Sequence, residues 1–252
     1  MQLQGPMRRL RGAWRLLRAV LHGLHGIAIV LLRFPRLDAA ARHARIAWWS
    51  AKMLRMLGLE LRVGGSFRPG AKLVVANHVS WLDIMAIHAV CPEARFVSKA
   101  EVRHWPLVNR LVDSAGTLYI EREKRRDALR VVHQMAEALQ AGQTVAVFPE
   151  GTTGPGPGLL PFHANLLQAA IATATPVQPV ALRYADAHGP FSASAQFLGE
   201  TTLAQSLWML ARGEQMVVHV DVLVAEGTAH ADRRLLAERL RDEIGHRLGA
   251  AV

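Results

Sequence analysis

Residues 77–83 read NHVSWLD and place a histidine and an aspartate five positions apart. They directly follow the apolar run 73–76, which predicts a buried strand. Reactive groups in α/β proteins lie in the turns after strand ends, so we expect His78 in such a turn and Asp83 in the first turn of a helix. The carboxylate would hold one imidazole nitrogen, fix the tautomer and stabilise the imidazolium that forms when the other nitrogen takes a proton. A hydroxyl activated in this way could attack a thioester carbonyl, by the logic of a serine protease whose substrate supplies the hydroxyl.

A purely structural explanation exists for the same residues. Ser80-x-x-Asp83 also fits a capping box, in which Ser80 caps a helix that begins at Trp81. The chain holds 12 histidines, and most of them must be ordinary surface or core residues. The stretch by itself therefore leaves both interpretations open.

A second polar turn follows the apolar run 144–148. Residues 148–154 read FPEGTTG, so Glu150, Gly151 and Thr152 offer a carboxylate, backbone N–H groups and a hydroxyl at a sheet edge. Such groups can hold a polar head group or an oxyanion. An ordinary glycine-rich turn is the alternative.

Two cations lie near further apolar segments. Arg122 follows the run 117–120, and its guanidinium group could bind a phosphate or a carboxylate. Lys99 is a weaker candidate of the same type. Residues 121–126 form the charge run EREKRR, so a solvated surface is the alternative for Arg122.

The segments that must position these groups alternate between strands and helices. An amphipathic helix is expected over about 127–141, ending at Gly142, and a final helix over 231–248. Apolar strands separated by helices argue for an α/β fold with a mostly parallel central sheet flanked by helices. The five predicted strands are residues 73–76, 117–120, 144–148, 177–182 and 216–224.

The basic charge is concentrated in the N-terminal quarter of the chain. The net charge is +10, and residues 1–62 hold 12 Arg and Lys against two acidic residues. Apolar side chains and tryptophans fill the intervals between the arginines, which suits a bilayer interface and argues against nucleic acid as a partner. We therefore predict a membrane-associated pair of helices over 1–62, with anionic membrane lipids as partners, and an α/β domain over 63–252.

The first helix is marginal as a membrane span. Residues 19–32 contain no Asp, Glu, Lys or Arg, and 14 helical residues reach about 21 Å against a hydrocarbon core of about 30 Å. Phe34-Pro35 should end this helix, and a second helix is expected over 39–59. A shallow or re-entrant helix is at least as consistent, and a core helix with a basic edge is the structural alternative. No small-residue cleavage site follows the apolar run, so a cleaved signal peptide is not expected.

Composition argues against several other chemistries. Cys91 is the single cysteine, so no internal disulfide is expected, and no paired-cysteine or HExxH spacing suggests a structural zinc site. The chain also lacks the GxxxxGK[ST] and GxGxxG loops that bind nucleotides. Neither zinc nor nucleotide chemistry is therefore expected.

Four stretches, in this order, resemble the glycerolipid acyltransferase superfamily, in particular bacterial 1-acyl-sn-glycerol-3-phosphate acyltransferases. The family motifs N-H-x4-D, G-x-x-[FY]-[IV]-x-R, F-P-E-G-T and V-x-P-V match residues 77–83, 116–122, 148–152 and 177–180. The resemblance covers roughly residues 70–185, and the ordered set is far more specific than any one motif.

The resemblance implies that His78 is the base, Asp83 its partner and Arg122 a contact to the phosphate of the acceptor. The acyl donor would be acyl-CoA or an acyl carrier protein, and no metal or organic cofactor is implied. The enzyme would sit on the cytoplasmic face of a bacterial inner membrane, seated by its N-terminal helices. The expected substrate-binding residues are Asn77, Lys99, Arg122, Glu150, Gly151 and Thr152.

One departure from the family pattern concerns the acceptor. Many members have arginine after F-P-E-G-T, whereas this chain has Thr153, which removes one phosphate ligand. We expect acyl transfer to the sn-2 hydroxyl of 1-acyl-sn-glycerol-3-phosphate, which forms phosphatidic acid in phospholipid biosynthesis. A lyso-ornithine lipid, which lacks phosphate, is the alternative acceptor. A membrane scaffold without enzymatic activity is the alternative of another class, and it leaves the four motifs unexplained.

Overall fold

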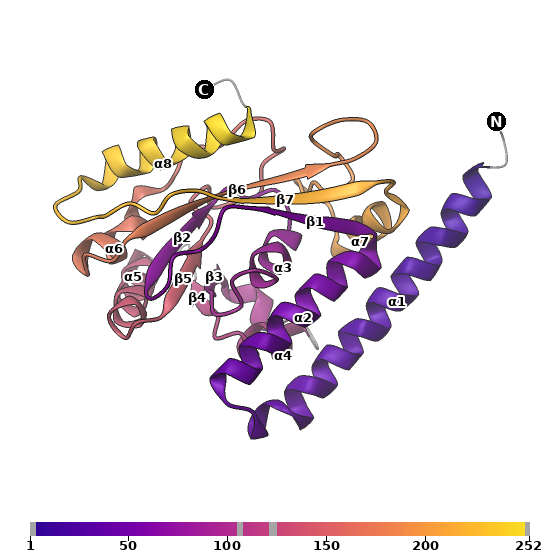
Figure 1. Cartoon of the computed structure of the whole chain (residues 1–252), viewed down its shortest axis with the longest axis horizontal. Helices are drawn as coiled ribbons and strands as arrows, with labels where there is room; N and C mark the ends of the chain where they lie inside the picture. The colour runs from indigo at the N-terminus through magenta and orange to yellow at the C-terminus, as the bar shows by residue number, and fades with distance from the viewer. Residues whose placement is uncertain (1–3, 105–107, 121–124, 250–252) are drawn as a thin grey trace.

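The computed structural model of the chain describes residues 4–104, 108–120 and 125–249. In this part of the chain, helices cover both faces of a seven-stranded sheet (Figure 1). The strands are β1 (Leu59–Gly64), β2 (Lys72–Ala76), β3 (Arg95–Lys99), β4 (Leu118–Ile120), β5 (Thr144–Val147), β6 (Val177–Ala185) and β7 (Met216–Val222). The helices are α1 (Gln4–Leu32), α2 (Ala39–Leu57), α3 (Leu82–His88), α4 (Val108–Ser114), α5 (Arg125–Gln140), α6 (Gln168–Ala172), α7 (Leu203–Arg212) and α8 (Arg233–Leu248), with 3₁₀ turns η1 (Phe34–Arg36), η2 (Ala100–His104) and η3 (Ala164–Leu167).

The sheet has the strand order β1-β7-β6-β2-β5-β3-β4. Neighbouring strands run parallel except for β6 and β7, which are antiparallel. The predicted α/β class with a mostly parallel sheet is therefore confirmed. The carboxyl ends of β2 and β5 lie at the same edge because these two strands are parallel neighbours. The turns that follow them are thereby brought together.

Both faces of the central strands are buried, and β2 and β5 are buried at every residue. Val74 and Ala76 pack in one core with side chains of α2, α3 and α7, while Leu73 and Val75 pack in a second core with α5, α6 and α8. A strand buried on both faces has a continuous apolar sequence, which is why β2 was predictable. The two cores hold the end of β2 rigidly where the NHVSWLD turn begins.

Two strands, β1 and β3, were not predicted. Both include charged side chains and neither forms a continuous apolar run, so their sequences resemble those of polar connections. α2 ends at Leu57 and is capped by Gly58, whose left-handed φ of +93° terminates the helix, and β1 begins at Leu59. Residues 59–62, which we assigned to the helical pair, are therefore part of the sheet.

The N-terminal half of α1 is bound to the α/β domain by arginines. Arg8 and Arg11 form ion pairs with Glu214, at 3.2 and 2.6 Å. Arg15 Nη1 donates to the carbonyl oxygen of Gly213 at 2.7 Å, just after the end of α7. Three of the arginines that we attributed to lipid binding thus hold α1 against the domain.

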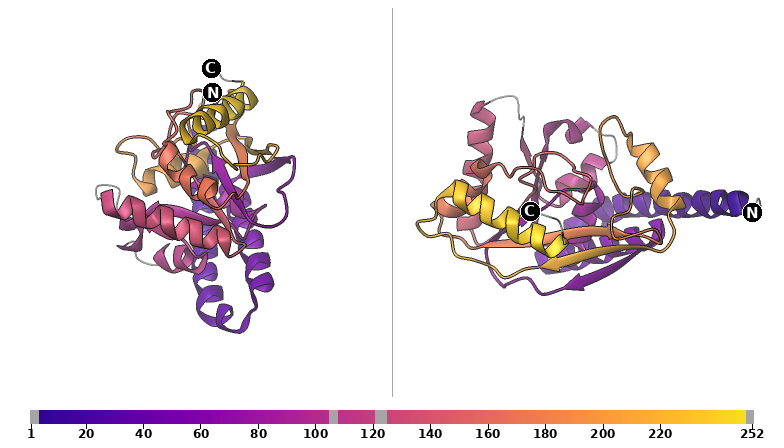
Figure 2. Two further views of the ribbon diagram at one scale, coloured as in Figure 1. Left: turned by 90° about the vertical axis from the view of Figure 1, so that its left-hand side faces the viewer. Right: turned by 90° about the horizontal axis from the view of Figure 1, so that it is seen from above.

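Farther along, α1 packs on α2 through His22 and Trp49. His22 Nε2 lies 3.0 Å from the carbonyl oxygen of Trp49, and Trp49 Nε1 donates to the carbonyl oxygen of His22 at 3.0 Å. The two rings stack with centroids 5.3 Å apart. Gly26 permits this approach, because a Cβ there would overlap the indole ring. The helical pair is therefore a fixed unit; Figure 2 shows its position beside the sheet, with α1 extending past the sheet toward its N-terminus.

The opposite side of α1 is apolar and exposed. By length and composition, α1 with η1 is sufficient to cross a membrane. Its inner side, however, makes the hydrogen bonds of Arg15 and His22 to the rest of the protein, which leaves only the outer side for lipid. Exposed apolar surface on this scale marks an interaction surface, and on a helix it suits a bilayer interface. The residues of this outer stripe are Met7, Leu10, Trp14, Leu17, Leu21, Leu24 and Leu31.

Candidate active site

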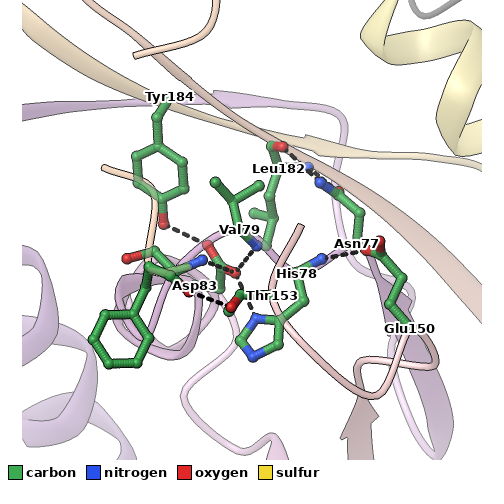
Figure 3. Close-up of polar contacts among 10 residues, drawn as sticks. Asn77, His78, Val79, Asp83, Glu150, Thr153, Leu182 and Tyr184 are labelled. Atoms are coloured by element: carbon green, nitrogen blue, oxygen red, sulfur yellow. Dashed lines mark hydrogen bonds and ion pairs between the residues drawn. The ribbon is translucent and has the colours of Figure 1, made fainter. Parts of the chain in front are cut away.

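His78 and Asp83 lie in contact at the end of β2, as their spacing predicts. His78 Nδ1 is 2.8 Å from Asp83 Oδ2 (Figure 3). Because an ionised carboxylate only accepts hydrogen bonds, Nδ1 carries the proton of the neutral ring and Nε2 keeps its lone pair. The Asp83 side chain is 0% exposed and that of His78 is 19% exposed, so the acid is sealed while the imidazole reaches the surface. In the described part of the chain, no protein group forms a hydrogen bond with Nε2.

The turn wraps its backbone around the Asp83 carboxylate. Asp83 Oδ2 accepts hydrogen bonds from the N–H groups of Val79 at 2.7 Å and Ser80 at 2.9 Å. The predicted capping box is only half formed, because the hydroxyl of Ser80 is buried and has no partner among the described residues. The helix begins at Leu82 rather than at Trp81, and no side chain caps it. The same carboxylate therefore holds the backbone of the turn and also binds the imidazole.

The other oxygen of Asp83 is bound by a residue that sequence analysis missed. Tyr184, in β6, donates its hydroxyl to Asp83 Oδ1 at 2.6 Å. A tyrosine in a buried strand must place its hydroxyl against a polar group, which is the signal that points to such a residue. The sequence contains no indication of which group that would be.

Glu150 holds the backbone on both sides of this site. Its Oε1 accepts from the N–H of His78 at 2.7 Å, and its Oε2 accepts from the N–H of Leu160 at 2.9 Å. The carbonyl oxygen of His78 in turn accepts from the N–H of Gly154 at 2.7 Å. Burial raises the pKa of Glu150, and the two N–H donors oppose that rise. Both carboxylate oxygens are therefore engaged by main chain.

Phe148 supports the imidazole from one side. The rings of His78 and Phe148 are stacked, with centroids 4.1 Å apart and planes 7° from parallel. Phe96 lies behind Phe148 at a centroid distance of 5.6 Å. Since Asp83 fixes one ring nitrogen and Phe148 covers one ring face, the direction of Nε2 is determined.

Asn77 joins the end of β2 to β6. Its side-chain amide donates to the carbonyl oxygen of Leu182 at 2.9 Å and accepts from the N–H of Leu182 at 2.7 Å. Asn77 is 1% exposed. We expected a substrate contact from this residue, whereas its amide extends the pairing of the two strands past Ala76.

The turn after β5 presents its backbone beside His78. Gly151 has a left-handed φ of +73°, which suits glycine, and its N–H donates to the carbonyl oxygen of Phe148. Thr152 is exposed, and in the described part of the chain no acceptor binds the N–H groups of Thr152 or Thr153. The hydroxyl of Thr153 donates to the carbonyl oxygen of Phe197. The backbone of this turn is therefore available to an anionic group, while the hydroxyl of Thr153 is not.

The two predicted cations are not placed by the structure. Lys99 ends β3, and its side chain lies outside the described part of the chain. Arg122 lies outside the described residues altogether. The predicted residues that the fold does bring together are Asn77, His78, Asp83, Glu150, Gly151 and Thr152.

Comparison with known proteins finds sequences that are similar to this chain. Residues 62–183 match a family model described as Acyltransferase. The chain is 39% identical over 241 residues to a lyso-ornithine lipid O-acyltransferase of Pseudomonas aeruginosa, covering 94% of this chain and 92% of the relative. It is also 39% identical over 189 residues to a 1-acyl-sn-glycerol-3-phosphate acyltransferase of Neisseria meningitidis, covering 75% of this chain and 73% of the relative.

A solved structure shows the same fold. The crystal structure of the 1-acyl-sn-glycerophosphate acyltransferase PlsC from Thermotoga maritima aligns with a TM-score of 0.68 and 22% sequence identity. The alignment covers 93% of this chain and 96% of that one. The shared architecture therefore extends through the N-terminal helices as well as the sheet.

Proposed function

This chain belongs to the acyltransferase family, and on that premise we propose that His78 and Asp83 transfer a fatty acyl group from a thioester to the hydroxyl of a lysolipid. The observation that carries the proposal is the 2.8 Å contact between His78 Nδ1 and Asp83 Oδ2, which leaves Nε2 of the neutral ring as an acceptor on a side chain that reaches the surface. An imidazole held in this way, with one nitrogen bound to a carboxylate and the other open, can act as a general base.

In the proposed reaction, one proton moves from the acceptor hydroxyl to His78 and then from His78 to the leaving sulfur. The acceptor hydroxyl gives its proton to His78 Nε2 while its oxygen attacks the thioester carbonyl carbon. The new C–O bond forms a tetrahedral intermediate with negative charge on the former carbonyl oxygen. Its collapse breaks the C–S bond, and the leaving sulfur takes the proton back from Nε2. Asp83 stabilises the imidazolium between these steps.

The negative charge of the intermediate requires hydrogen-bond donors. The N–H groups of Thr152 and Thr153 support this role, because no acceptor in the described residues binds them. The bond from the N–H of Gly154 to the carbonyl oxygen of His78, at 2.7 Å, keeps that turn beside the imidazole. Backbone donors at such a position stabilise an oxyanion without reorganising.

We propose 1-acyl-sn-glycerol-3-phosphate as the acceptor, acylated at its sn-2 hydroxyl to phosphatidic acid. The ordered motifs and the Neisseria meningitidis relative support this assignment. Arg122 would contact the phosphate, and Lys99 would lie near it. The donor would be acyl-CoA or an acyl carrier protein.

A lyso-ornithine lipid is the second candidate acceptor. Thr153 stands where many family members have arginine, and its hydroxyl is bound to Phe197 rather than facing an acceptor. The Pseudomonas aeruginosa relative, which matches 94% of this chain, adds support.

A direct comparison separates the two acceptors. Purified protein would be assayed with both lysolipids and one acyl thioester, and kcat/KM measured for each. A preference of about tenfold or more for the phosphate-bearing lysolipid, worth about 1.4 kcal/mol in the transition state, is expected. The reverse preference would replace the first acceptor with the second, and His78→Ala should abolish transfer to both.

The protein is membrane-associated, and we propose that it lies on the cytoplasmic face of a bacterial inner membrane. Support comes from the exposed apolar stripe of α1 and from the bacterial relatives that act on membrane lipids. Arg9 and Arg18 of α1 are exposed, and they are well placed to meet anionic head groups. The inner side of α1 is bound to the domain, so we place this helix in the plane of the membrane surface.

A further inference from the structure

The contact between Tyr184 and Asp83 lies outside the sequence motifs of the site. The motif segments end at residue 180, and the family match ends at residue 183, one position before Tyr184. Building on the proposed function, we propose that Tyr184 is a positioning residue that orients the Asp83 carboxylate and lowers the affinity of the His78–Asp83 pair for its proton. The hydroxyl of Tyr184 is 2.6 Å from Asp83 Oδ1, the length of a hydrogen bond to an ionised acceptor.

The donors around Asp83 are divided unequally between its two oxygens. Oδ2 accepts three N–H groups, from the ring of His78 and from the backbone of Val79 and Ser80. Oδ1 accepts from Tyr184, which is its only partner among the described residues. Without the phenol, Oδ1 would be a buried carboxylate oxygen with no donor, which is a costly state. Tyr184 therefore completes the coordination of the carboxylate in its working orientation.

The position of Tyr184 follows from the register of β6. β6 pairs with β2 up to Ala76 and Val180, and the amide of Asn77 continues the pairing to Leu182. Two residues on, Tyr184 lies on the same side of the strand as Leu182, facing the core that contains α3. Its ring thus reaches past the end of β2 to the carboxylate (Figure 3).

Tyr184 acts as a donor at every working pH. Its side chain is 2% exposed, and burial together with the neighbouring Asp83 charge raises the pKa of its hydroxyl well above the ordinary value. In the described residues, Tyr184 and Glu150 are the titratable groups that contact the pair, and Glu150 is bound to backbone through both oxygens. The charge that Asp83 presents to His78 is therefore sensitive to the hydrogen bond from Tyr184.

The direction of that sensitivity follows from electrostatics. The phenol draws negative charge toward Oδ1, so less remains on Oδ2 to stabilise the imidazolium. Removing the phenol leaves more negative charge on Oδ2 and so favours the imidazolium form of His78. Since the base must be neutral to act, the acid limb of the activity profile moves to higher pH.

The main test is Tyr184→Phe, which removes the hydroxyl and keeps the ring. The acid limb of kcat/KM and the NMR titration of the His78 ring should both shift upward by about one pH unit, since a hydrogen bond to a charged group is worth about 1.5–3 kcal/mol and one unit corresponds to about 1.4 kcal/mol. At neutral pH, kcat should fall by about tenfold while the acceptor KM stays within about twofold. A folded variant in which neither the profile nor the titration moves would overturn the proposal.

A matched control is Ser206→Ala. Ser206 Oγ accepts from Trp81 Nε1 at 3.1 Å, so this variant also removes a partly buried hydrogen bond to the same turn, but one that does not involve the carboxylate. It should leave the His78 titration unchanged. An equal shift in both variants would show that Tyr184 acts by general packing alone, against the proposal.

A second variant keeps the test valid if Tyr184→Phe does not fold. Fluorotyrosine placed at position 184 is a stronger donor of the same shape, so the acid limb and the His78 titration should move to lower pH. A shift in the other direction, or none, would refute the inferred role. The NMR titration is independent of substrate, so a wild-type protein inactive toward every lysolipid would reject the proposed function and leave this test standing.

Discussion

The backbone N–H of His78 donates to Glu150 Oε1 at 2.7 Å, so the turn that carries the imidazole is tied to a carboxylate from the turn after β5. The second oxygen of Glu150 accepts from the N–H of Leu160 at 2.9 Å. One buried side chain thus connects the turn that holds the base to the glycine-rich loop that follows Glu150. Sequence resemblance implied a role in acceptor binding or catalysis for this residue, whereas the geometry favours a role in holding the backbone.

Glu150→Gln should lower kcat more than it raises the acceptor KM. The amide has one acceptor atom, so its NH₂ group must face either the N–H of His78 or that of Leu160, and one buried bond is lost. We expect kcat to fall by about tenfold or more, with the acceptor KM within about twofold, from steady-state assays. Glu200→Gln, at an exposed position, is the matched control and should have wild-type kinetics. A raised KM with unchanged kcat would instead identify Glu150 as an acceptor contact.

Replacement of His78 or Asp83 should remove activity without removing membrane binding. His78→Ala deletes the base. In the wild type, three N–H groups share one oxygen of the Asp83 carboxylate, and Asp83→Asn replaces that carboxylate with a neutral amide. We expect losses in kcat on the order of 10³-fold or more, by analogy with other acid–base–nucleophile sites. Transfer of a labelled acyl group and co-sedimentation with vesicles measure the two properties separately. Undiminished turnover of His78→Ala would disprove the mechanism.

His88 should make folding stability depend on pH. Its ring is buried, contacts the carbonyl oxygen of Ala94 at 3.0 Å, and has its pKa lowered to about 4 chiefly by burial. The unfolded chain binds the proton below about pH 6.5, so it holds more protons than the folded chain between that pH and about 4. The contribution of His88 is therefore fully present above pH 6.5 and is lost as the pH falls, by up to about 3 kcal/mol.

Denaturant unfolding from pH 7.5 to 4.5 measures this effect. His88→Gln keeps a donor near Ala94 and lacks the titration, so its free energy of unfolding should vary less with pH than that of the wild type. His22, whose pKa is also lowered by burial, remains in both proteins and cancels in the difference. Parallel curves for the two proteins would show that His88 does not carry the dependence.

The parts of the site that were predictable are those that depend on local spacing. His78 and Asp83 are five residues apart, so one turn brings them together wherever β2 lies in the sheet. Tyr184 reaches the same carboxylate from 101 residues away, and only the pairing of β6 with β2 determines that contact. Glu150 was recognised by its motif, but its two backbone partners depend on how two loops pack. Local patterns thus indicated the reacting groups and left their supports undetermined.

The binding partners of the arginines in α1 were also left undetermined by the sequence. Net charge and apolar intervals predicted a membrane surface, and the exposed outer stripe of α1 agrees with that prediction. Arg8, Arg11 and Arg15 nevertheless bind the protein itself, because Glu214 and the end of α7 lie against this helix. Charge in a sequence does not distinguish a lipid partner from a distant carboxylate of the same chain.

The in-plane placement of α1 predicts the depth of its residues in the bilayer. Leu10, Leu17, Leu24 and Leu31 lie on the outer stripe, and the first and last are about 31 Å apart along a helix. Each would be replaced in turn by cysteine and spin-labelled, and the native Cys91 is buried and should not react. In vesicles with anionic lipids, all four labels should lie at a similar shallow depth, about 5–10 Å below the head groups.

A spanning helix gives a different depth profile. In that case the labels at 17 and 24 would lie near the bilayer centre, while those at 10 and 31 would lie near opposite surfaces. That profile would contradict the in-plane placement, because Arg15 would have to leave the carbonyl oxygen of Gly213 that it binds after α7. A label at Glu238, exposed on α8, is the control and should remain accessible to aqueous relaxation agents.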